Sequence, residues 1–211
     1  MRKPIIVILS LTMTTGYSQK DQKATDFLDQ VSARTKSYNS IKVDFSYKME
    51  NSKAKIKEEK FGTLLLSGDK YQMQASGQTV ICDGKTIWTF MPETNEVQVN
   101  SLDAKDEALT PSKLLSNYNT NFKSKLISDK SNTDPNCTVV ELIPNSPKNY
   151  TRAVLAVDKT RLQIKYFMIY DKNGNIFTYT ITRFQTNVQI NPGDFTFDPK
   201  KYPGIEVIDM R

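Results

Sequence analysis

Short segments in which apolar and polar residues alternate recur along most of this chain. The clearest begins at residue 41, where Ile41, Val43, Phe45, Tyr47 and Met49 alternate with polar residues. A period of two is typical of a half-buried antiparallel strand. The same habit predicts further strands at 60–67, 70–75, 79–82, 86–91, 96–100, 122–128, 137–143, 153–157, 163–170, 176–184 and 195–197. Turn residues between them, clearest at 83–84 and 172–175, predict a meander of hairpins.

Two helices are predicted beside these strands. Residues 24–38 place Leu28, Val31 and Tyr38 on one face at helical spacing, and a shorter helix at 113–118 carries Leu114 and Leu115. A sheet of about eleven strands twists, so it must close into a barrel or wrap around something. We therefore expect the helices to pack on its concave side, over either a filled core or a lipid-sized apolar pocket.

The first eighteen residues have the pattern of a cleaved secretory signal peptide. Arg2 and Lys3 precede an apolar run at 4–13, and the small residues Gly16 and Ser18 follow it. The run is too short to span a membrane, where roughly twenty apolar residues are needed. The sequence thus predicts a signal peptide over 1–18 and one soluble, exported domain over 19–211.

Composition excludes several kinds of site. The chain has no His and two Cys, so neither a Cys/His zinc site nor imidazole catalysis is available, and we expect no cofactor. Common nucleophile and phosphate-loop motifs are missing. Lysines at 53–60 are interspersed with Glu, which favours a solvated loop over a nucleic-acid site.

Two alternatives stay open from the residues alone. Cys82 and Cys137 could form a disulfide after export or remain buried thiols. A hydrolase using carboxylates such as Asp44 or Asp83 is conceivable, although Asp83 is more simply a turn residue.

Residues 79–92 (TVICDGKTIWTFMP) resemble a motif of the LolA-type periplasmic carriers of outer-membrane lipoproteins. That motif is an apolar strand, a D-G-K turn, Leu/Ile-Trp-x-Tyr/Phe and proline. Similar family motifs follow the same order along the chain, at 45–47, 62–64, 71–73, 141–144, 194–199 and 204–209. The resemblance therefore covers nearly the whole predicted mature chain.

The resemblance implies an α+β, mostly β fold: an unclosed antiparallel β-barrel of about eleven strands with an α-helical lid. Its hydrophobic cavity would hold the acyl chains of lipoproteins. By analogy, a soluble, monomeric periplasmic carrier would receive them from an inner-membrane ABC transporter and pass them to an outer-membrane acceptor, without catalysis. The candidate acyl-chain contacts are Leu28, Val31, Phe45, Leu64, Leu66, Tyr71, Met73, Trp88, Phe90, Leu114 and Leu115.

Three points qualify these contacts. The arginine-proline pair with which the family holds its lid closed is replaced by Ser67-Gly68-Asp69, and the family's usual tryptophan by Met73. These departures motivate an alternative cargo, such as a glycolipid or a lipid-linked pigment. A shift of one residue would also exchange Leu64 for Leu65 and Trp88 for Ile87.

Overall fold

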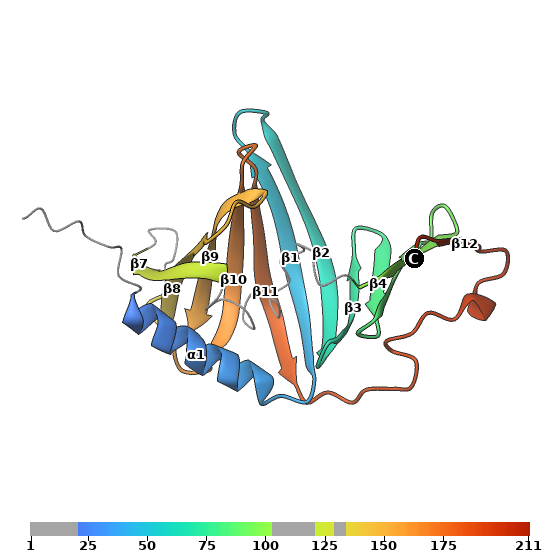
Figure 1. The fold of residues 1–211 in the computed structure, drawn as a ribbon, viewed down its shortest axis with the longest axis horizontal. Helices are drawn as coiled ribbons and strands as arrows, with labels where there is room; N and C mark the ends of the chain where they lie inside the picture. Colours follow the sequence, from blue (N-terminus) through green and yellow to red (C-terminus); the bar gives the residue numbers. More distant parts are fainter. Residues whose placement is uncertain (1–20, 103–120, 129–133) are drawn as a thin grey trace, which may run out of the picture.

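A computed structural model describes residues 21–102, 121–128 and 134–211 of the chain. Twelve strands and the helix α1 (Gln22–Lys36) make up most of this part (Figure 1). The strands are β1 (Ile41–Asn51), β2 (Ile56–Ser67), β3 (Lys70–Ala75), β4 (Gln78–Cys82), β5 (Thr86–Met91), β6 (Glu96–Ser101), β7 (Phe122–Ile127), β8 (Cys137–Pro144), β9 (Tyr150–Asp158), β10 (Gln163–Asp171), β11 (Ile176–Thr186) and β12 (Glu206–Asp209). The predicted helix at 113–118 lies outside the described residues.

The strands form one sheet in the order β12-β6-β5-β4-β3-β2-β1-β11-β10-β9-β8-β7. All neighbours are antiparallel except β12, which pairs in parallel with β6. Two meanders, β1 to β6 and β7 to β11, are joined where β1 pairs with β11. Because β7 and β12 are edge strands, the sheet is an unclosed barrel, and the predicted mostly β fold class is confirmed.

Helix α1 lies across β8 to β10 on one face of this sheet, which we call the inner face (Figure 1). The helix begins earlier than the periodicity predicts. Its N-cap is Asp21, whose side chain accepts a hydrogen bond from the Ala24 amide. The first turn holds no acidic residue, and the carboxylate at this end belongs to the N-cap.

The chain after β11 corrects another prediction. Residues 195–197 are not a strand; they belong to a long irregular segment that crosses to the far edge of the sheet and ends in β12 (Figure 1). Phe197 packs against Phe90 and Tyr202 there, with ring centroids 5.4 and 5.0 Å away. The alternation of phenylalanines at 195–197 therefore reflects packing on a face of the sheet and not strand pairing. We call this face the outer face.

Apolar side chains are buried on both faces of the sheet. On the inner face, α1 packs against β7 to β10, and the cluster continues through Tyr179 onto β1 and β2. On the outer face, one cluster lies on β8 to β10 and another beneath the C-terminal segment. Among the described helices, none is long and apolar enough to cross a membrane.

Candidate functional site

The inner face carries a continuous apolar surface that α1 covers only in part. Leu28 and Val31 of α1 are fully buried against a group of sheet residues that includes Leu142 and Leu155. This contact is the usual packing of an amphipathic helix on a sheet. The helix therefore acts as a cover over β7 to β10, as the predicted lid helix would.

Beyond the helix the same face continues over β1, β2 and β3. Cross-strand register aligns Val43 with Leu64, and Leu64 with Met73. One row away, Leu66 stands between Ile41 and Tyr71. The β1 members of these rows are buried, whereas the members on β2 and β3 are half-buried. Leu64, and not its neighbour Leu65, therefore lies on the inner face.

Phe45 fills a notch that Gly62 leaves in the inner face. A methyl group on Gly62 would come within 2.6 Å of both the Phe45 ring and the Gln74 carbonyl oxygen. The missing side chain lets the Phe45 ring lie over the neighbouring strand, where it is 6% exposed. The glycine of the G-x-L motif thus has a packing role at this face.

Five aromatic rings meet where β1, β10 and β11 adjoin. Tyr179 stacks on Phe167 with centroids 4.4 Å apart and planes 4° apart, and lies 4.9 Å from Tyr47. Phe45 and Phe177 complete the group. Burial, with a smaller effect from Tyr47, raises the pKa of Tyr179 to about 12. Burial and the nearby Glu58 carboxylate raise the pKa of Tyr47 as well.

Trp88 and Phe90 lie on the outer face, not with the other candidate residues. Register aligns Trp88 with Ile81, and both belong to the cluster beneath the C-terminal segment. Ile87, by contrast, aligns with Cys82 and so shares a face with Tyr71. The structure therefore separates these two candidates from Leu28, Val31, Phe45, Leu64, Leu66, Tyr71 and Met73. Leu114 and Leu115 lie outside the described residues.

Two polar contacts hold the ends of α1 in place. The Asp21 carboxylate accepts hydrogen bonds from the Ala24 amide at 3.2 Å and, across to edge strand β7, from the Leu126 amide at 2.9 Å. These bonds lower the pKa of Asp21, with the one from Leu126 contributing most. After the helix, Ser67 donates to the Asn39 carbonyl at 3.0 Å. Ser67 therefore ties the end of β2 to the link between α1 and β1.

The two cysteines form no disulfide with each other and are buried in separate places, Cys82 on β4 and Cys137 on β8. Of the two alternatives, the buried-thiol reading is correct. Burial, followed by the nearby Asp134 carboxylate, raises the pKa of Cys137. A thiol that is harder to ionise is less reactive, which fits a role in packing.

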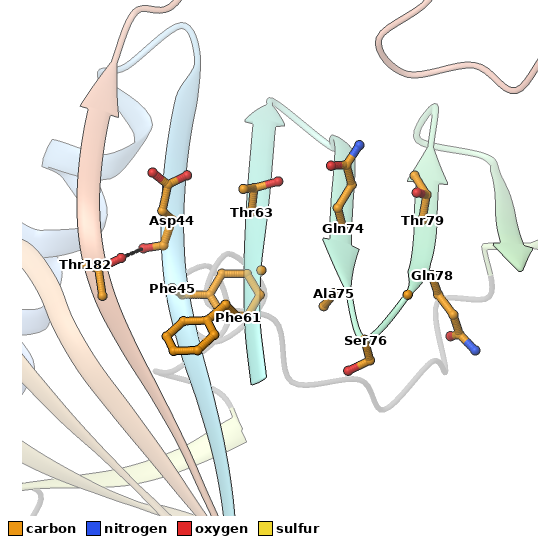
Figure 2. A pocket seen from close by; sticks show the side chains of 12 residues that line it. Asp44, Phe45, Phe61, Thr63, Gln74, Ala75, Ser76, Gln78, Thr79 and Thr182 are labelled. Atoms are coloured by element: carbon orange, nitrogen blue, oxygen red, sulfur yellow. Dashed lines mark hydrogen bonds between the residues drawn. The ribbon is translucent and has the colours of Figure 1, made fainter. Parts of the chain in front are cut away.

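The two carboxylates considered for catalysis do not share a site. Asp83 accepts hydrogen bonds from the Lys85 and Thr86 amides at 2.8 and 2.7 Å, which lower its pKa, so it is a turn residue. Asp44 lines an open pocket that crosses β1 to β4 (Figure 2). Within the described residues, no group of three His, Cys, Asp or Glu side chains could hold a metal ion.

The pocket in Figure 2 is open and is lined by polar and apolar residues, the latter including Phe45, Phe61 and Ala75. Asp44, Thr63, Gln74 and Thr79 stand in one row across four strands, as the register requires. This row alternates with the inner-face rows along each strand, so it belongs to the outer face. The pocket therefore includes outer-face residues, but Phe45 of the inner-face cluster lines it too.

Sequence reasoning missed part of the inner face. Phe167 and Tyr179 join the five-ring group but were not among the candidates. Their alternation was visible in the predicted strands at 163–170 and 176–184. The pairing of β1 with β11 could not be predicted from the sequence alone, because this pairing brings together residues about 130 positions apart.

Comparisons with known proteins agree with this geometry. The sequence model of the LolA family, described as outer membrane lipoprotein carrier protein LolA, matches residues 36–198. An outer-membrane lipoprotein carrier protein of Pectobacterium carotovorum is 25% identical over 210 residues, which cover 97% of this chain and 95% of the relative.

Solved structures match this chain at low sequence identity. An uncharacterized conserved protein from Thermus thermophilus superimposes with a TM-score of 0.60 at 12% identity, covering 89% of this chain and 99% of that one. Lipoprotein LppX of Mycobacterium tuberculosis gives a TM-score of 0.47 at 13% identity, covering 81% and 98%. The first of these supports the fold alone.

Proposed function

Because this chain belongs to the LolA family of outer membrane lipoprotein carrier proteins, we propose that it carries lipoproteins by binding their acyl chains on the inner face of its sheet. Members of this family are carriers and not enzymes. We further propose that it works in the periplasm, between an inner-membrane ABC transporter and an outer-membrane acceptor. The signal-peptide pattern at 1–18 supports export.

The observation that carries the proposal is the continuous apolar inner face, covered on one side by α1. Transfer of a sixteen-carbon acyl chain from a membrane into water costs on the order of 12 kcal/mol, at about 0.8 kcal/mol per CH₂. An apolar surface that receives the chains removes most of this cost. No chemical step is needed, because the carrier only has to bind and release.

The acyl-chain contacts that we propose are the inner-face candidates: Leu28, Val31, Phe45, Leu64, Leu66, Tyr71 and Met73. Leu28 and Val31 are fully buried in this structure, so chains could reach them only if α1 moved away from the sheet. Trp88 and Phe90 are left out because two faces of one sheet cannot line one cavity. The contact of Leu114 and Leu115 with acyl chains stays a prediction.

The alternative cargo keeps the same surface. A glycolipid or a lipid-linked pigment also presents an apolar chain and a polar group, and Met73 provides a flexible side chain that adapts to irregular shapes. The proposal gives lipoproteins priority because both the matching family and the Pectobacterium relative are named as lipoprotein carriers.

Native mass spectrometry of the protein, purified gently from its own periplasm, tests the proposal. We expect complexes that release intact acylated lipoproteins on denaturation. Free glycolipid or pigment would favour the alternative cargo. Recovery of only ligand-free protein that also fails to bind an apolar dye would contradict both.

A further inference from the structure

Two tyrosine hydroxyls interrupt the apolar inner face without a hydrogen-bond partner among the described residues. Tyr47 and Tyr179 are paired across β1 and β11, and both are half-buried. None of the described residues forms a hydrogen bond with either hydroxyl, although every fully buried side-chain nitrogen or oxygen of the described residues has a partner. Both hydroxyls therefore remain accessible on this face. Tyrosine hydroxyls in such surroundings usually have a hydrogen-bond partner.

The pair lies at a boundary between apolar and charged rows of the inner face. Towards one end of β1, the next rows contain Phe45 and then Val43 with Leu64. Towards the hairpin tip, Tyr47 is aligned with Lys60, and the following row pairs Met49 with Glu58. A molecule lying along β1 would thus meet hydrocarbon, then two hydroxyls, then charge.

We infer that the Tyr47 and Tyr179 hydroxyls bind the ester carbonyl groups of the cargo, where its acyl chains join the polar glyceryl-cysteine group. The chains then extend over Phe45 and Val43, and the polar group points towards Lys60 and Glu58 at the hairpin tip. This inference rests on the proposed function and adds to it the orientation of the lipid and a preference for acylated glycerol over plain hydrocarbon.

The protonation state of these groups fits a donor role. With a pKa of about 12, the Tyr179 phenol keeps its proton at neutral pH, and the pKa of Tyr47 is raised too. An ester carbonyl only accepts hydrogen bonds, so it needs such donors. Stacking of Tyr179 on Phe167 at 4.4 Å fixes the ring, so little side-chain entropy is lost on binding.

The test compares two synthetic lipopeptides of equal chain length. One carries two ester-linked fatty chains on the glyceryl group of its N-terminal cysteine, and the other carries the same chains through ether bonds. Tyr47→Phe, Tyr179→Phe and the double variant remove the hydroxyls but keep the rings. Tyr202→Phe is the matched control, since this tyrosine also stacks on a phenylalanine, Phe197, but lies on the outer face.

We expect each inner-face substitution to weaken binding of the ester lipopeptide roughly 2- to 10-fold, the range for one hydrogen bond. The ether lipopeptide and an apolar dye should bind all variants alike, and Tyr202→Phe should match the wild type. Equal losses for ester, ether and dye would overturn the inference, because they indicate disturbed packing. So would an unchanged affinity for the ester lipopeptide in the double variant.

The two proposals fail in different ways. If the wild-type protein binds neither lipopeptide, acyl-chain carriage itself is wrong, and the hydroxyl anchor is wrong with it. If the wild type binds both lipopeptides and the double variant does so equally well, only the anchor is wrong.

Discussion

At the scale of single residues, Asp21 joins the helix to the sheet. One carboxylate oxygen caps α1 through the Ala24 amide, and the other accepts from Leu126 on edge strand β7. Sequence periodicity did not reveal this cap. The polar residues Gln22 and Lys23 carry no apolar signal, so the predicted helix started at Ala24. The lid of this protein thus has an anchor that does not depend on the family's arginine.

We predict that Asp21→Ala loosens the N-terminal end of α1. Hydrogen exchange of the Ala24 and Leu126 amides should accelerate, because both lose their acceptor. Asp26→Ala is the control, since Asp26 lies in the same helix and accepts a hydrogen bond from the exposed Gln22 side chain. Equal exchange at Ala24 and Leu126 in the two variants would contradict the anchor.

The same contact predicts a pH dependence. Because the folded-state pKa of Asp21 lies below 3.8, its bonds stabilise the helix end fully above that pH. The stabilisation is lost as the pH falls through the lowered pKa. Exchange at Leu126, corrected for the intrinsic rate, should therefore approach that of Asp21→Ala in strong acid and differ from it at neutral pH.

At the scale of elements, the strands could be predicted well from alternation. The segments 70–75 and 86–91 coincide with β3 and β5, and β1 begins at Ile41 as predicted. Strand β2 starts at Ile56, four residues before the predicted start. The prediction began late because the charged residues at this end do not alternate with apolar ones. Alternation could not decide which face is inner, since both faces carry apolar clusters.

Strand β2 offers a direct test of the inner face. Leu66 lies on that face beside Ile41 and Tyr71, whereas Leu65 points to the outer face beside Gln72. We predict that Leu66→Glu lowers affinity for an acylated lipopeptide at least 10-fold, because the chain would meet a charge. Leu65→Glu should retain binding. Loss of binding in Leu65→Glu alone, with both variants folded by circular dichroism, would reverse the assignment of faces.

The outer-face aromatic residues should contribute to stability and not to cargo binding. Phe90 is 9% exposed and packs 4.5 Å from Tyr202 between ring centroids. Phe90→Ala should lower the free energy of unfolding by about 3 kcal/mol, measured in urea. Lipopeptide affinity should change little when measured well below the unfolding transition. Phe45→Ala is the matched variant, which we expect to lower both quantities; a selective loss of binding in Phe90→Ala would show that Phe90 does contact cargo.

At the scale of the whole molecule, local patterns identified most strands but not their assembly. Hairpin turns explain the neighbours within each meander. The pairing of β1 with β11, and of β12 with β6, joins segments far apart in the sequence, so turn signals do not encode it. The unclosed barrel was predicted instead from the family motifs, which occur in the same order along this chain. The inner face exists as one surface only because β1 meets β11.

We predict that cargo binding on this surface displaces α1 from the sheet, and a reversible tether can test that movement. The hydroxyls of Thr25 on α1 and Ser124 on β7 lie 3.4 Å apart. This contact makes Thr25→Cys/Ser124→Cys the pair to cross-link, and both native thiols are buried elsewhere.

The oxidised double variant should take up an apolar dye and an acylated lipopeptide at least 10-fold more slowly than its reduced form, because Leu28 and Val31 stay packed on the sheet. The single variant Thr25→Cys, treated with the same oxidant and reductant, controls for the reagents and should show no change. Mass spectrometry under denaturing conditions verifies the disulfide. Uptake at the same rate in both redox states would mean that chains reach the inner face without displacing α1, over the half-buried rows of β2 and β3.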